Sequence, residues 1–325
     1  MSKYFSDNTP LSDKQENKKV EQNNSDSNLE LFYNHFNCPD TPDVIELKNI
    51  NQVYGDKVII KDLNFLAEKK IGSGSFKVIL GPSGCGKSTL LRYIAGLQKP
   101  TSGDILLNEK PQKKDDHVGM VFQKYSSFPW RTVKENVYYG LEINNTKLHW
   151  LNNKLRGLLK KEQRELLSKK EMEEMAMEMI KSVGLLGHED KYAQYPNLSG
   201  GQLQRVAIAR SLLSTPDILL MDEPFGALDV PTRLQMQDML LNLYNKIKPT
   251  VILITHDIQE AVYLADDIYI MSHAPSKIVH HVNVSSVLPG DRKGIKRELK
   301  FVELVHKIED LMMKVDQEKN KKNEK

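Results

Sequence analysis

The sequence predicts an α/β fold, in which helices separate the strands of a parallel sheet. Four short runs are aliphatic or β-branched, as the buried strands of such sheets are. They span Phe76–Leu80, Ile218–Met221, Val251–Ile254 and Ile268–Met271. Stretches of helical character separate these runs, so strands and helices alternate along the chain.

The chain also has strand character before the first of these runs and helical character near its end. Val44–Leu47 and Val58–Ile60 have the character of short β-strands, and a glycine-rich turn at Gly81–Ser88 leads into a helical pattern. Within residues 292–325, apolar residues share one face of a further predicted helix. They are Phe301, Val305, Ile308, Met312 and Val315.

Composition excludes some classes of protein. The chain has 325 residues, a formal net charge of +3 and a mean hydropathy of −0.49. No stretch approaches the roughly 20 apolar residues of a membrane-spanning helix, which excludes a membrane-spanning subunit. A net charge near zero gives no argument for nucleic-acid binding. Residues 1–43 hold four lysines against eight acidic residues, and we expect a disordered acidic tail there.

The glycine-rich turn matches the pattern of a phosphate-binding loop. Its residues are Gly81, Pro82, Ser83, Gly84, Cys85, Gly86, Lys87, Ser88 and Thr89. Glycines allow the backbone amides to face phosphate oxygens, and the following helix adds its positive end. We expect Lys87 to reach the β- and γ-phosphates of ATP and Ser88 to bind Mg²⁺. The same helix end favours a thiolate at Cys85, so we expect alkylation of Cys85 to block ATP binding.

A second apolar run ends in two acidic residues, Asp222 and Glu223. A buried strand would place Asp222 at the carboxyl edge of the sheet, where it can hold Mg²⁺. Glu223 is then suited to orient or deprotonate an attacking water. The alternative is a surface pair that caps the strand.

The segment Leu198–Gln202 reads LSGGQ and leads into a helical pattern. Here the sequence resembles the ATP-binding subunits of ABC transporters. The resemblance implies a phosphate-loop core with an antiparallel N-terminal β part and an inserted helical subdomain at about 124–213. It also implies a homodimer that closes around two ATP molecules. Four residues would then contact ATP held by the second copy: Ser199, Gly200, Gly201 and Gln202.

Four further positions match motifs of the same family. The resemblance implies that Gln123 contacts Mg²⁺ and water, and that the segment around it faces a membrane partner. It implies that Asp229 crosses the dimer interface, that His256 contacts the γ-phosphate, and that Tyr54 stacks on adenine. A single histidine after a strand is usually structural, but the order and spacing of these motifs over about 200 residues favour the family.

Finer features resemble the ATPases of nitrate, sulfonate and taurine importers. They are Phe128–Val137 and Ile258–Asp267. The chain departs from that group because Ala274–Val279 lacks a glycine after its proline and because the stretch 144–181 is longer. The resemblance implies ATP and Mg²⁺ as cofactors, and a peripheral position on the cytoplasmic face of the inner (plasma) membrane.

The implied partners are a second copy, transmembrane permease subunits and an extracytoplasmic substrate-binding protein, with no nucleic acid. The expected domains are the tail at 1–43, the ATPase at 44–277 and a basic helical extension at 278–325. The alternatives are an ABC exporter or lipid-trafficking ATPase, and a soluble ABC ATPase without a transport role.

Overall fold

The computed structural model describes most of the chain from residue 44 onward. The described residues are 44–68, 74–113, 118–124, 126–143, 166–214, 216, 218–292 and 294–323. The predicted tail at 1–43 and most of the long stretch at 144–181 lie outside them. In the described part of the chain, no helix is long and apolar enough to span a membrane.

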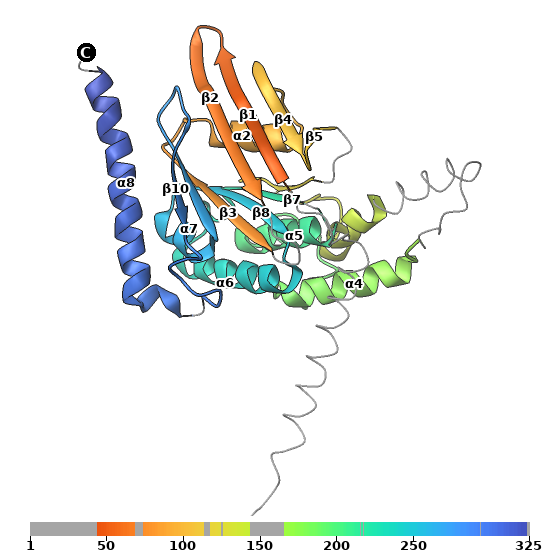
Figure 1. The fold of residues 1–325 in the computed structure, drawn as a ribbon. Coiled ribbons are helices and arrows are strands. Elements are labelled where there is room, and N and C mark those ends of the chain that lie inside the picture. The colour runs from red at the N-terminus through yellow and green to blue at the C-terminus, as the bar shows by residue number, and fades with distance from the viewer. Residues whose placement is uncertain are drawn as a thin grey trace, which may run out of the picture.

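A six-stranded sheet forms the centre of the molecule (Figure 1), in the order β10-β9-β3-β8-β7-β6. Its strands are β3 (Ser75–Leu80), β6 (Val118–Val121), β7 (Ile218–Asp222), β8 (Thr250–Thr255), β9 (Asp267–Met271) and β10 (Ile278–Asn283). All neighbours are parallel except β10, which pairs antiparallel with β9. The four predicted buried runs are therefore strands of one sheet.

A second, antiparallel sheet has the order β2-β1-β4-β5. Its strands are β1 (Val44–Tyr54), β2 (Lys57–Glu68), β4 (Ser102–Leu107) and β5 (Lys110–Pro111). One apolar cluster joins this sheet, helix α2 (Lys87–Ile94) and one face of the central sheet, with Leu47, Leu90 and Ile252 among its members. The α/β fold with an antiparallel N-terminal part is confirmed.

Helices cover the other face of the central sheet. They include α5 (Gly200–Leu213), α6 (Val230–Ile247) and α7 (Ile258–Leu264), and α4 (Lys169–Ser182) packs against α5. Along β3, Val78 packs into the cluster on this helical side, whereas Ile79 packs into the cluster on the opposite side. Strands buried on both faces explain why the sequence shows continuous apolar runs there.

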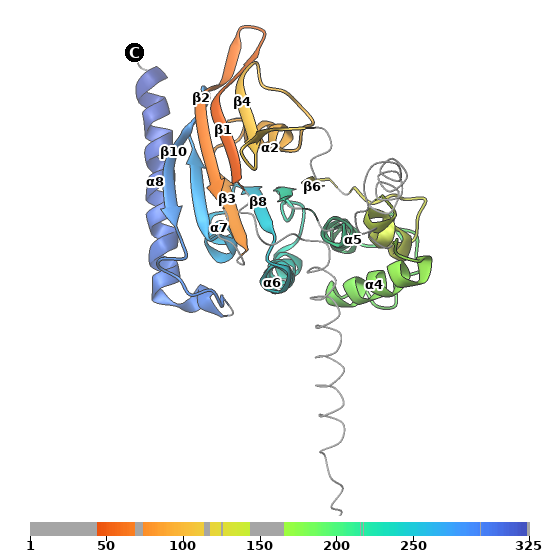
Figure 2. The same cartoon turned by 45° about the vertical axis from the view of Figure 1, so that its right-hand side comes forward.

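The end of the chain forms the predicted helix, α8 (Leu299–Asn323), after a short 3₁₀ turn, η1 (Ile295–Arg297). Figures 1 and 2 both place α8 beside α7 and β10, on the opposite side of the molecule from α4. Phe301 and Ile308 are buried in its packed face. Because β10 continues the sheet past residue 277, we propose that the helical extension begins after Asn283.

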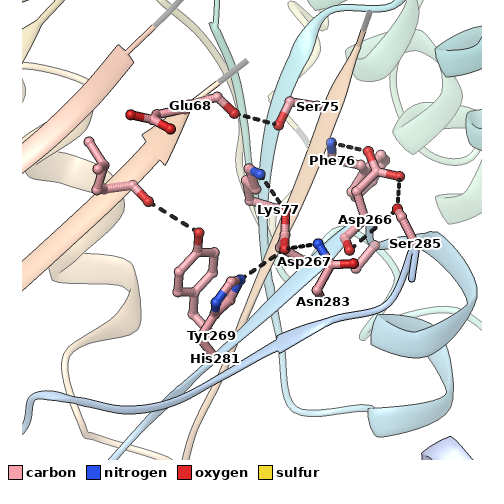
Figure 3. Close-up of polar contacts among 12 residues, drawn as sticks. Glu68, Ser75, Phe76, Lys77, Asp266, Asp267, Tyr269, His281, Asn283 and Ser285 are labelled. Atoms are coloured by element: carbon pink, nitrogen blue, oxygen red, sulfur yellow. Dashed lines mark hydrogen bonds and ion pairs between the residues drawn. The ribbon is translucent and has the colours of Figure 1, made fainter. Parts of the chain in front are cut away.

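The amino ends of β3 and β9 are held together by a buried ion pair (Figure 3). Lys77 Nζ donates to Asp267 Oδ2, while His281 Nε2 lies 2.8 Å and Asn283 Nδ2 2.9 Å from Asp267 Oδ1. Burial alone would raise the pKa of Asp267, but Lys77 and His281 outweigh it and lower that pKa. This network links β3, β9 and β10 at the edge of the sheet opposite the phosphate loop.

Candidate nucleotide site

The phosphate loop connects β3 to α2, and two glycines adopt its special backbone conformations. Gly84 has φ +75° and Gly86, the N-cap of α2, has φ +101°. Residues with a Cβ rarely adopt such angles, which explains the glycines. Lys87 Nζ lies beneath the loop and donates to the carbonyl oxygens of Gly81 (2.7 Å) and Pro82 (3.0 Å). These are weak partners for an ammonium group, so a phosphate anion can replace them.

Cys85 differs from the expectation. Its side chain is 1% exposed, and burial raises the pKa of the thiol more than the charge of Lys87 lowers it. Ser276, from the turn before β10, donates to the Cys85 carbonyl oxygen at 2.6 Å and helps to enclose this segment. The expected thiolate at the helix end is therefore wrong.

Two oxygen ligands suitable for Mg²⁺ meet beside the loop. Ser88 Oγ, in the first turn of α2, donates to Asp222 Oδ1 at the end of β7, over 3.1 Å. Burial raises the pKa of Asp222, and Glu223 raises it further, whereas the hydrogen bond from Ser88 lowers it. Mg²⁺ typically binds one or two protein oxygens together with substrate phosphates, and this pair fits that pattern.

Three predicted catalytic side chains meet at the carboxyl ends of adjacent parallel strands. Glu223 Oε2 accepts from Gln123 Nε2 at 3.2 Å and lies 3.3 Å from His256 Nδ1. These residues follow β7, β6 and β8, respectively. Glu223 has φ +43°, an unfavourable angle for a residue with a side chain. Its amide donates to the Ile254 carbonyl oxygen at 3.0 Å, which holds this backbone in place.

The LSGGQ segment begins helix α5 with a capping box. Ser199 Oγ accepts from the Gln202 amide, and Gln202 Oε1 accepts from the Ser199 amide. Gln202 Nε2 also lies 2.9 Å from His188 Nε2. A Cβ on Gly201 would lie 2.7 Å from Thr232 Cγ2, so only glycine allows α5 to approach α6 this closely.

Asp229 and Tyr54 occupy positions consistent with the expected contacts. Asp229 is the N-cap of α6 and accepts from the Thr232 amide at 3.3 Å, which places it next to the start of α5. Tyr54, at the end of β1, is half exposed, and its hydroxyl accepts from Gln98 Nε2 at 2.6 Å. Its ring is therefore available to an adenine base.

Comparison with known proteins agrees with this geometry. A family model described as ABC transporter matches residues 66–226. The nitrate import ATP-binding protein of Synechocystis is 39% identical over 280 residues, with 82% of this chain and 94% of that protein covered. This chain belongs to the ABC transporter ATPases. It is an ATP-binding ATPase subunit that hydrolyses ATP to drive transport.

Two other relatives of this ABC ATPase are informative. An aliphatic sulfonates import ATP-binding protein of Bacillus cereus is 38% identical, with 80% of this chain and 91% of that protein covered. A solved dimeric ATP-binding cassette in a post-hydrolysis state, bound to ADP and phosphate, is 30% identical. It covers 74% of this chain and 98% of its own, with a TM-score of 0.56.

Sequence reasoning missed two residues that organise the site of this ABC ATPase. Asn136, which is fully buried, accepts from the Phe128 amide at 2.7 Å and donates to three carbonyl oxygens between Phe128 and Thr132. Arg233 connects two loops through Leu228 and Asp257. An asparagine at the start of a helical stretch and an arginine four residues after Asp229 gave no distinctive signal in the sequence.

Proposed function

We propose that this chain is the ATPase subunit of an importer for a small oxyanion or sulfonate, such as nitrate or an aliphatic sulfonate. The importer relatives reported above support this substrate class. The observation that carries the catalytic part is the meeting of Gln123, Glu223 and His256 beside Ser88 and Asp222.

In this proposal, the phosphate loop binds ATP through its amides, and Lys87 moves from two carbonyl oxygens to the β- and γ-phosphates. Ser88 and Asp222 hold Mg²⁺, with Gln123 nearby; when bound, the ion would neutralise charge on the phosphates. Glu223 orients the attacking water, and Gln123 and His256 fix the position of the Glu223 carboxylate. His256 also donates to the γ-phosphate, which completes the site from the third strand.

A second copy completes each site. Ser199, Gly200, Gly201 and Gln202 would contact ATP bound to the partner's phosphate loop, because they form the N-terminus of α5 and this end of a helix is positive. Asp229 lies next to this surface and would cross the same interface. ATP then joins two copies, and hydrolysis releases them.

We further infer how the subunit connects to its membrane partners. Trp130 is 70% exposed, and Phe128 beside it packs against Tyr139 and Arg210, so Trp130 projects from a firmly held segment. We assign this surface to the permease subunits, at the cytoplasmic face of the inner (plasma) membrane. An extracytoplasmic binding protein would deliver the substrate.

The direct test is transport by the reconstituted system. The full chain, its permease and its binding protein are placed in vesicles, and uptake of labelled nitrate and of an aliphatic sulfonate such as taurine is measured with ATP supplied on the side of the ATPase. We expect ATP-dependent movement of one of them from the binding-protein side toward the ATPase side. Movement of substrate in the opposite direction only would contradict import, and hydrolysis without movement of either would contradict the substrate class.

A further inference from the structure

Arg233 contacts two loops that the proposed function assigns to different ATP sites. Its Nη2 donates to the Leu228 carbonyl oxygen at 3.1 Å, and its Nη1 lies 3.4 Å from Asp257 Oδ2. Leu228 directly precedes Asp229, which would reach the partner's ATP, and Asp257 directly follows His256, which would contact this chain's own ATP. One guanidinium therefore joins both loops.

Each contact partner is itself firmly held. Asp257 is the N-cap of α7: its Oδ1 accepts from the Glu260 amide at 3.0 Å, and its amide donates to Thr255 Oγ1 at 3.1 Å. The Leu228 side chain is buried in the core, and the neighbouring Asp229 caps α6. Because both contact partners are held in place, a displacement of one loop would be transmitted through Arg233 to the other loop.

The chemistry of arginine suits this position. A guanidinium presents several donors in a rigid planar fork and can bond two acceptors in different directions at once. A lysine at the same position would keep the charge but would lack this fixed two-point geometry. The contact to Asp257 also adds charge attraction to the hydrogen bond.

We propose that Arg233 is a positioning residue that couples His256 to Asp229 and thereby links the two ATP sites of the dimer. The inference rests on the proposed function, because the roles of His256 and Asp229 and the dimer belong to it. Binding of the γ-phosphate at His256 shifts Asp257, and Arg233 passes this shift to the loop that completes the partner's site.

The first test is a double-mutant cycle on ATP hydrolysis by the full chain, with kcat and KM measured for R233Q, D257N and the double variant. The D257N change would keep the Oδ1 acceptor for the helix cap but remove the charge that faces Arg233. We expect each single variant to lower kcat by about tenfold, with KM changed less than about twofold. We expect the double variant to be no slower than R233Q, because both changes remove the same contact.

Two further variants separate this role from general effects. R233K keeps the charge without the planar fork, so we expect it to lower kcat as well. K110Q removes an exposed positive charge from β5, in the antiparallel sheet, and we expect wild-type kinetics. Wild-type kcat in R233Q and R233K, or strictly additive losses in the double variant, would overturn the link to His256. If R233Q fails to fold, R233K and its double variant with D257N give the same comparison.

The second test examines the link to the partner's site with mixed dimers of one wild-type and one variant copy, separated by two affinity tags. D257N and R233Q both break the contact between the two loops. We expect each mixed dimer to hydrolyse ATP more slowly than the mean rate of the wild-type and variant homodimers, and a rate equal to that mean would overturn the coupling. If the wild type hydrolyses ATP and R233Q has the same kinetics, this inference alone is refuted. Normal ATP turnover in E223Q would instead refute the proposed catalytic roles.

Discussion

Glu260 illustrates what burial does to a single carboxyl group. It lies in α7 with 4% of its surface exposed, and burial raises its pKa to about 8. Asp257 raises this pKa further, while Thr255, Arg233 and Gln237 lower it by less. At neutral pH the group is therefore mainly protonated in the folded protein, whereas in the unfolded chain it is ionised.

This difference predicts a pH-dependent effect of E260Q on stability. Between about pH 4.5 and pH 8 the folded protein retains a proton that the unfolded chain loses, so the contribution of Glu260 to stability falls as the pH rises. The slope is at most about 1.4 kcal/mol per pH unit. We expect the free energy of unfolding of E260Q to exceed that of the wild type by an amount that grows across this window and levels off above it. A constant difference between the two proteins would contradict the buried, protonated state.

Cys85 gives a second prediction at the scale of one residue. Because the thiol is buried and its pKa is raised, we expect iodoacetamide to modify it slowly in the folded protein and fast after unfolding in guanidinium. Mass spectrometry of the tryptic peptide measures both rates. Equal rates in the two states would mean that the thiol is accessible, and a faster rate in the folded protein would support the sequence-based thiolate prediction.

The same residue shows why sequence reasoning failed here. The glycine-rich pattern and the helix start were local and correctly indicated a phosphate loop. The burial of Cys85 instead depends on distant residues, such as Ser276, which contacts its backbone across 191 positions of the chain. Local patterns do not report such contacts.

At the scale of elements, strands were predictable where both faces are buried, as in β3 and β8, because their sequences are continuously apolar. β10 was not identified as a strand. Its sequence includes His280, His281 and Asn283, and only its pairing with β9 reveals it. The meeting of Gln123, Glu223 and His256 was expected from the family resemblance, since strand order cannot be read from a single sequence.

Asn136 carries a prediction about the segment between β6 and the helical residues 133–143. In N136A, the Phe128 amide and the carbonyl oxygens of Phe128, Arg131 and Thr132 lose their buried partner. We expect a loss of at least about 2 kcal/mol in the free energy of unfolding, measured with urea. N245A, on the exposed side of α6, serves as the control, with an expected change below about 0.5 kcal/mol. Equally small changes in the free energy of unfolding for N136A and N245A would show that the Asn136 contacts do not stabilise the segment.

At the scale of the whole molecule, the two ends of the central sheet have different roles. The amino ends of β3 and β9 are closed by the neutralised network around Asp267 (Figure 3), whereas the carboxyl ends carry the phosphate loop and the proposed catalytic cluster. Ligand binding at the carboxyl ends of parallel strands is the general rule for such sheets. The LSGGQ segment and Asp229 lie at the starts of α5 and α6, a surface that the proposed function assigns to contact with a second copy.

The most direct test of this account is ATP-dependent dimer formation by E223Q. Removal of the Glu223 charge should stop hydrolysis while leaving the phosphate loop, Ser88 and Asp222 intact. We predict that E223Q with Mg²⁺ and ATP elutes as a dimer in size-exclusion chromatography and retains two ATP molecules per dimer, whereas K87A stays monomeric under the same conditions. Normal ATP turnover by E223Q, or a monomer that holds ATP without dimerising, would contradict the assigned role of Glu223 and the shared ATP site.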